Sequence, residues 1–275
     1  MRISAPHRLH LRGLLALCAG VGIACAAEPP FDGTSFIDPD IVTPGTPTTF
    51  TGLNFVGMGT RTMFDRRINA FANYNVYLFN ATYSGMPSPV EFQVNAEFGT
   101  QAVAQAEVAL YAPIMGRMPQ ILRTRLEMVW VHRGDQPFGG GNNSLLIHTG
   151  DGTGTGWYAD YYFVSGMIEE VILHELAHTS LDPDHAVAPG WLAARQADSE
   201  FISSYARDNP TREDVAETFG PWFALRCTRT ALAPAMAQVI ESTVPNRLTY
   251  FDAQDFDLSP IACAGSVFEN GFEQN

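Results

Sequence analysis

Hydrophobic and polar residues alternate in two different ways along the chain. The expected strands are short β-prone runs rich in β-branched and aromatic residues: 75–82, 89–94, 126–132 and 144–148. The expected helices repeat apolar residues at intervals of three and four: 100–115, 163–180, 190–206, 212–226 and 231–242. Strands that are followed by a run of helices predict an α+β fold, with a small sheet and a helical C-terminal half.

The first 60 residues lack such patterns. Residues 27–60 are rich in proline, threonine, glycine and aspartate, as in the run from Thr43 to Thr49, and this composition predicts a flexible N-terminal arm. We therefore expect the folded domain at 61–250 and a C-terminal tail at 251–275.

Residues 1–26 have the features of an export signal. Arg2, Arg8 and Arg12 precede an apolar stretch, and Ala24-Cys25-Ala26 is an A-x-A-like cleavage site. No later segment has the roughly 18 uninterrupted apolar residues that a membrane-spanning helix needs. We expect a secreted or periplasmic protein with no membrane span.

Two of the four cysteines, Cys18 and Cys25, lie in the expected signal peptide. Cys227 and Cys263 would remain, and an even pair in an exported protein predicts one disulfide bond. The alternative is two unrelated buried thiols.

The charge and the composition narrow the class of partner. The net charge is −13, whereas a protein that binds nucleic acid needs a basic surface, so we expect no nucleic-acid partner. All basic residues are arginines, which excludes chemistry that depends on a lysine. We expect a monomer.

An H-E-x-x-H motif, formed by His174, Glu175 and His178, lies in an apolar run of helical character. Residues four apart project from the same face of a helix, so the two histidines can hold one metal ion. Glu175 can then serve as the general base for a water molecule at that ion. The motif predicts a Zn²⁺ site of the hydrolase type.

A catalytic zinc ion needs a third protein ligand, and the segment after the motif offers one candidate. A metzincin-like continuation would place a glycine three residues after His178, where this chain has Leu181, and a ligand three residues further, at Asp184. His185 follows directly. The segment therefore matches that pattern only in part.

A later helix and two remote histidines offer further candidates for the third ligand. Glu213 and Glu217 lie four apart on one face of the expected helix 212–226, so one could bind zinc while the other orients a histidine. Nothing in the sequence argues for His132 or His148.

Two short segments resemble a known family. The run from Ser204 to Asn209 (Ser-Tyr-Ala-Arg-Asp-Asn) and the run from Glu213 to Phe219 follow the H-E-x-x-H motif as they do in the gluzincin zinc metallopeptidases. The chain is most similar to the catalytic domain of the lethal-factor toxin family, over about 174–219. The resemblance implies that Glu213 is the third zinc ligand, that Glu217 supports the site from behind, and that the phenol of Tyr205 stabilises the transition state.

The resemblance also implies a zincin-like fold and an exported endopeptidase that acts on peptides or proteins. Compared with the toxins, one extra residue lies between Tyr205 and Glu213, and the link from His178 to Tyr205 is shorter. The shorter link changes the pocket, so the toxins' substrate choice is not transferred. In zincin folds a strand such as 144–148 pairs with an extended substrate.

Two alternatives have different consequences. A non-catalytic zinc-binding or toxin-like interaction module would bind the metal without turnover, and its zinc would have four protein ligands. A zinc hydrolase that cleaves a non-peptide amide, such as a cell-wall cross-link, is the other alternative.

Overall fold

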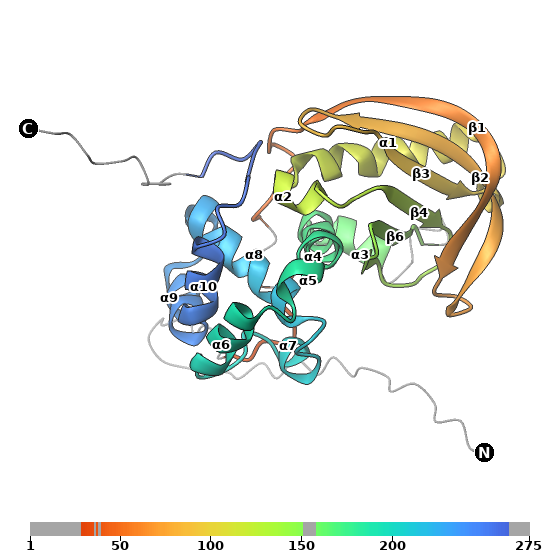
Figure 1. The fold of residues 1–275 in the computed structure, drawn as a ribbon. Coiled ribbons are helices and arrows are strands. Elements are labelled where there is room, and N and C mark those ends of the chain that lie inside the picture. Colours follow the sequence, from red (N-terminus) through yellow and green to blue (C-terminus); the bar gives the residue numbers. More distant parts are fainter. Residues whose placement is uncertain (1–28, 36, 38–39, 151–157, 264–275) are drawn as a thin grey trace, which may run out of the picture.

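A computed structural model describes residues 29–35, 37, 40–150 and 158–263. These residues form a six-stranded mixed sheet and a helical second half, which confirms the α+β class (Figure 1). The expected signal peptide lies outside the described residues, as does the end of the expected tail from residue 264 on.

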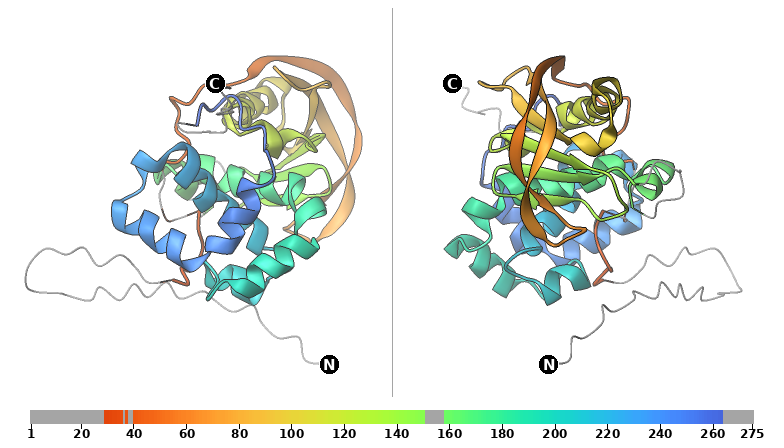
Figure 2. Two further views of the ribbon diagram at one scale, coloured as in Figure 1. Left: turned by 60° about the vertical axis from the view of Figure 1, so that its left-hand side comes forward. Right: turned by 90° about the vertical axis from the view of Figure 1, so that its right-hand side faces the viewer.

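The sheet has the strand order β1-β2-β3-β4-β6-β5. Strands β1 to β3 are antiparallel to one another, β3, β4 and β6 run parallel, and β5 is antiparallel to β6. The long β1–β2 hairpin forms one edge of the sheet and is strongly curved (Figure 2). The strands are β1 (Phe50–Asp65), β2 (Ala70–Tyr83), β3 (Val90–Asn95), β4 (Met128–His132), β5 (Gly139–Gly141) and β6 (Ser144–His148).

Helix α1 (Gln101–Arg117) follows β3 and packs on one face of the sheet. The side chain of Thr100 caps its first turn by accepting a hydrogen bond from the N–H of Val103. The other described α-helices are α2 (Gln120–Arg123), α3 (Ala159–Val164), α4 (Ile168–Ser180), α5 (Asp182–His185), α6 (Pro189–Ala197), α7 (Ser204–Asp208), α8 (Asp214–Cys227), α9 (Pro234–Thr243) and α10 (Pro245–Asp252).

One continuous apolar core joins the sheet to the helical half, and α4 lies between them (Figure 1). A smaller apolar cluster occupies the other face of the sheet, around Met63 and Trp130. Within the described ranges, no helix is both long enough and apolar enough to span a membrane.

Two helices that the sequence pattern predicts as continuous are interrupted. The predicted helix 163–180 is split between α3 and α4 at Gly166, whose φ of 70° a helix cannot contain. The predicted helix 190–206 ends at Ala197 and restarts as α7. Asp198, which follows the break, accepts hydrogen bonds from the backbone and side chain of Arg247 on α10.

The predicted flexible arm at 27–60 is wrong for the described residues. Strand β1 begins at Phe50, and Phe31, Ile41 and Val42 are buried in the main core. Along most of β1 half-buried residues alternate with exposed ones, so its polar composition belongs to a strand with a solvated face.

The described part of the tail packs on the domain. The N–H groups of Gln120 and Ile121 donate to the carbonyl oxygens of Ser259 and Asp257. A disulfide joins Cys227 at the end of α8 to Cys263, which confirms the predicted pairing.

Candidate metal centre

Helix α4 carries the H-E-x-x-H motif through the middle of the molecule. Eleven of its thirteen residues are buried, since it packs against β5 and β6 on one side and against α8 on another. Burial on several sides fixes the helix, and so fixes the direction in which its histidines project.

Three ligand atoms converge beside this helix. The Nε2 atoms of His174 and His178 lie 3.1 Å apart. The Oε2 atom of Glu213, the residue that precedes α8, lies 3.0 Å from Nε2 of His178 and 3.6 Å from Nε2 of His174. In the part of the chain that the structure describes, this is the one group of three or more such side chains arranged to hold a metal ion.

The donor atoms fit a cation. Oε2 of Glu213 is buried and accepts no hydrogen bond, although it lies between two imidazole nitrogens. A buried carboxylate oxygen without a partner is costly unless a positive charge satisfies it. A metal ion bound by His174, His178 and Glu213 would remove that cost.

A carboxylate also lies beside the second ring nitrogen, Nδ1, of each histidine. Nδ1 of His178 lies 2.7 Å from Oδ2 of Asp182, within hydrogen-bonding distance. Nδ1 of His174 lies 3.3 Å from Oε1 of Glu217, at ion-pair distance but without hydrogen-bond alignment. Carboxylates in this position direct the Nε2 lone pairs of ligand histidines toward the metal. Glu217 thus lies beside the Nδ1 atom of His174, and Asp182 lies beside that of His178.

Asp182 was missed as a supporting residue. It lies four positions after His178, the same spacing that joins the two histidines, and this was the available signal. The backbone of Leu181, which joins α4 to α5, keeps helical angles. The side chain of Asp182 therefore remains on the face of the helix that carries the ligands.

The electrostatics of the metal-free centre show what charge it prefers. Burial alone would lower the pKa of His178, but the carboxylates of Asp182 and Glu213 beside its ring raise that pKa to about 10. Burial would raise the pKa of Glu213, yet its contacts with the two imidazoles hold that pKa well below its usual range. The carboxylates therefore favour positive charge at the centre, supplied either by protons or by a metal ion.

Glu175 follows His174 and is half-buried where α4 passes under β5. A Cβ atom at Gly140 would lie 1.7 Å from the carbonyl oxygen of Glu175, so only glycine allows this approach. The hydroxyl of Thr179 fixes the same contact, because it accepts from the N–H of Gly141 and donates to the carbonyl of Ser144.

Tyr205 on α7 lies near both carboxylates of the centre. Its side chain is partly exposed, and its pKa is raised by burial and then by the nearby charges of Glu213 and Glu175. The structure thus brings Tyr205 together with the motif and with Glu213.

The other candidate ligands lie elsewhere. Asp184 is exposed and pairs with Arg125, with 2.7 Å between Oδ1 and the guanidinium nitrogen. Nδ1 of His185 lies 2.8 Å from the hydroxyl of Tyr250. His132 and His148 belong to a separate buried cluster on the sheet.

The expectation that strand 144–148 pairs with a substrate is wrong. This strand, β6, is hydrogen-bonded to β4 along its length, and β5 occupies its other edge at Ser144–Leu146, where a substrate strand would have to pair. The glycine run 139–141 forms the edge strand β5. Asn142 and Asn143, both with positive φ, turn the chain between the two strands.

Comparisons of the chain with protein-family models, with curated proteins and with solved structures found no match. The functional conclusion therefore depends on the residues and the geometry of the centre itself.

Proposed function

We propose that this chain is an exported zinc-dependent endopeptidase of the gluzincin type with a zincin-like fold. The observation that carries the proposal is the convergence of both Nε2 atoms of the H-E-x-x-H motif on the unpartnered oxygen of Glu213. Glu175 lies on the same helix, one residue from His174.

The ligand set favours zinc over harder cations. Calcium and magnesium prefer sets of oxygen ligands, whereas two imidazole nitrogens with one carboxylate suit zinc. Three protein ligands are the number that catalytic zinc sites have, with a fourth position open for water or substrate. The carboxylates of Glu217 and Asp182 behind the imidazoles support the same assignment.

The proposed mechanism assigns one task to each side chain. His174, His178 and Glu213 hold the ion, and bound zinc supplies Lewis-acid chemistry that lowers the pKa of water and polarises a carbonyl group. Glu175 takes the proton from the attacking water and returns it to the leaving amine. The phenol of Tyr205 donates a hydrogen bond to the oxygen on which negative charge develops.

A peptide or protein is the proposed substrate, and β5 replaces β6 as its proposed pairing strand. β5 is the edge strand that contacts α4, so an extended peptide beside it would lie close to Glu175. A disulfide such as Cys227–Cys263 forms in an oxidising compartment, which supports secretion or a periplasmic location.

The test combines metal binding with turnover on a peptide library. The wild-type chain should bind one zinc ion and cleave peptides, and a chelator should abolish cleavage. Glu175→Gln should retain the zinc and lose at least about 100-fold in kcat, since it removes the general base. The matched control is Glu127→Gln, which makes the same change at an exposed position.

The outcomes separate the alternatives. Full activity in Glu175→Gln would disprove the mechanism. Zinc bound by the wild type without cleavage of any peptide would favour a non-catalytic zinc module or a different amide substrate. Absence of zinc binding would contradict the proposal as a whole.

A further inference from the structure

The described residues between 31 and 42 (31–35, 37 and 40–42), which we call the N-terminal segment, are tied to the helices around the centre. Phe31 pairs with the residues before α7: its N–H donates to Ile202 and its carbonyl accepts from Ser204. At the other end, the N–H of Val42 donates to Oε1 of Glu170 on α4, at 3.0 Å. A segment expected to be a solvated arm is thus hydrogen-bonded at both ends.

Between these ends, the N-terminal segment contacts Glu217, the carboxylate that lies behind His174. The backbone N–H of Thr34, a buried residue, donates to Oε2 of Glu217 at 2.8 Å. The other oxygen of the same carboxylate, Oε1, lies 3.3 Å from Nδ1 of His174. Glu217 therefore joins the backbone of Thr34 to the imidazole that would bind the metal.

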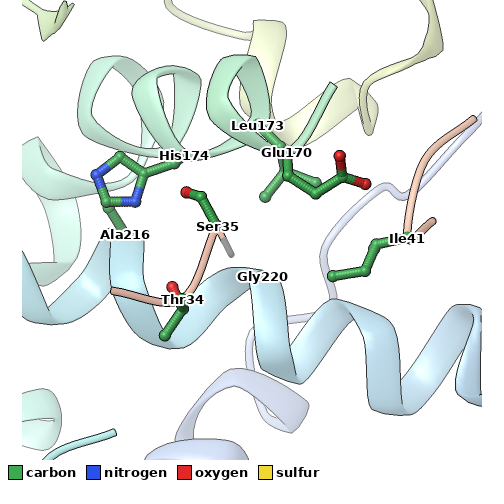
Figure 3. A pocket seen from close by; sticks show the side chains of 8 residues that line it. All are labelled: Thr34, Ser35, Ile41, Glu170, Leu173, His174, Ala216 and Gly220. Atoms are coloured by element: carbon green, nitrogen blue, oxygen red, sulfur yellow. The ribbon is translucent and has the colours of Figure 1, made fainter. Parts of the chain in front are cut away.

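The N-terminal segment also closes a small cavity behind that imidazole. Figure 3 shows it crossing between α4 and α8, with the side chain of His174 facing the cavity. The cavity is lined by Thr34, Ser35 and Ile41 from the segment, and by Glu170, Leu173, His174, Ala216 and Gly220 from the two helices.

We propose that the N-terminal segment is a positioning element of the metal centre, and this inference rests on the proposed zinc site. The N–H of Thr34 fixes the carboxylate of Glu217, whose negative charge at ion-pair distance from Nδ1 of His174 favours the ring orientation that turns Nε2 toward the other ligands. A carboxylate held at one oxygen only can rotate away, and supporting residues of this kind change metal affinity by about 10- to 100-fold.

The same segment fixes the start of α7. Its backbone pairing brackets Ser203, whose side chain caps α7 by accepting from the N–H of Ala206. Since α7 carries Tyr205, one stretch of chain positions both the support of His174 and the helix that bears the proposed phenol.

The first test removes one N–H group. Proline has no backbone N–H, so Thr34→Pro deletes the donor to Glu217, whereas Thr34→Ala keeps it. The preceding residue is Gly33, the residue least restricted by a following proline. We expect zinc affinity, measured by chelator competition, to fall at least about tenfold in Thr34→Pro and to be unchanged in Thr34→Ala.

Two further readouts separate positioning from a general structural effect. In a Glu217→Ala background the N–H of Thr34 has no carboxylate to hold, so adding Thr34→Pro should cause no further loss of zinc affinity. The absorption spectrum of the Co²⁺-substituted Thr34→Pro protein should differ from the wild-type spectrum, whereas that of Thr34→Ala should match it.

Hydrogen exchange tests the inference without any substitution. Binding free energies are reciprocal, so if the ordered N-terminal segment raises zinc affinity, zinc must raise the protection of the segment. Zinc should slow exchange of the Thr34 amide in the wild type. The amide of Thr49, bonded to Gly116 away from the centre, serves as the control.

The results also distinguish this inference from the proposed function. Equal zinc affinity in the wild type and a folded Thr34→Pro, or a Thr34 amide whose exchange zinc does not change, would overturn the inference alone. Failure of the wild type to bind zinc would overturn both. Where Thr34→Pro does not fold, the exchange measurement decides.

Discussion

Among the residues that the structure describes, two largely buried pairs of histidines have carboxylates nearby, and one of these two pairs is arranged to hold a metal. The metal centre has His174, His178 and Glu213 between α4 and α8. The second cluster, which we call the sheet cluster, has His132 on β4 and His148 on β6, with Asp65 close by. The residue types are nearly the same, so the difference is one of geometry.

In the sheet cluster the imidazoles lie side by side instead of facing a common point. The two rings are stacked, with centroids 5.3 Å apart and planes 22° apart. Nε2 of His132 donates to the carbonyl of Phe64, and Nδ1 of His148 donates to the carbonyl of Arg133, at 3.1 Å each. These hydrogen bonds fix the rings as parts of the sheet.

The carboxylates differ as much as the rings. Asp65 accepts hydrogen bonds from Arg67 and from the hydroxyl of Tyr74, so its charge is already compensated. Glu213 has no donor at Oε2 apart from the imidazoles that face it. The two clusters thus differ in their carboxylates: the charge of Asp65 is compensated by Arg67 and Tyr74, whereas Oε2 of Glu213 faces only the two imidazoles.

The protonation states follow the same division. Burial lowers the pKa of His132 to about 4, so this ring is neutral at pH 7. The pKa of His178 is raised to about 10 by its carboxylates, against the effect of burial. One cluster excludes positive charge and the other attracts it.

The largest effect is expected when one histidine is removed from each cluster, which tests whether only the metal centre binds zinc. His178→Ala removes a ligand, so zinc affinity should fall by more than about 100-fold, beyond the effect of losing a supporting residue. His148→Ala should leave zinc affinity unchanged and lower the free energy of unfolding. Isothermal titration measures the first quantity and urea unfolding the second. Equal loss of zinc in both variants would refute the distinction.

The sheet cluster should respond to acid. The pKa of His132 is lower in the folded chain than its ordinary value of 6.5, so the unfolded chain binds more protons between pH 6.5 and pH 4. Stability from the neutral ring is present above pH 6.5 and is lost as the pH falls toward 4, by about 3 kcal/mol.

This acid effect is measured as a difference between two proteins. The stability advantage of the metal-free wild type over His132→Gln should shrink as the pH falls from 7 to 4 in urea unfolding. The difference cancels groups such as Glu170, whose pKa burial raises to about 8. The difference also cancels the contribution of His178, which is present in both proteins. A constant difference would show that folding does not lower the pKa of His132.

The smallest expected effect compares two aspartates of α5. Asp182→Asn weakens the support of His178 and should lower zinc affinity about tenfold. Asp184→Asn is the matched control, since this exposed residue pairs only with Arg125 at the surface, where ion pairs contribute little. Chelator competition on both variants checks the prediction. A larger loss of zinc affinity in Asp184→Asn than in Asp182→Asn would contradict the assignment of Asp182 as the aspartate of α5 that supports His178.

The sequence predicted the elements whose patterns are strong. The apolar run around the motif predicted most of α4, the apolar periodicity of 212–226 predicted most of α8, and β6 has the predicted bounds. These segments are buried on several sides, so burial leaves a clear periodicity in their composition.

Other parts of the fold could not be predicted, for physical reasons. The N-terminal segment is buried through a few residues such as Phe31 and Thr34, and backbone hydrogen bonds, which leave no side-chain pattern, hold it in place. Strand β5 consists of glycines because Gly140 contacts the backbone of α4, and glycine carries no hydrophobic signal. Asp182, by contrast, has the four-residue spacing from His178 that the sequence shows, and the structure adds the hydrogen-bonding distance between the two side chains.

The central claim is that His174, His178 and Glu213 together bind zinc and leave one coordination position open. A crystal structure of the zinc-loaded protein, with anomalous scattering recorded at the zinc edge, tests it most directly. The account predicts one strong peak within about 2.0–2.2 Å of both Nε2 atoms and of the Glu213 carboxylate, with no fourth protein ligand. A peak at the sheet cluster, a fourth protein ligand, or no peak at the centre would contradict it.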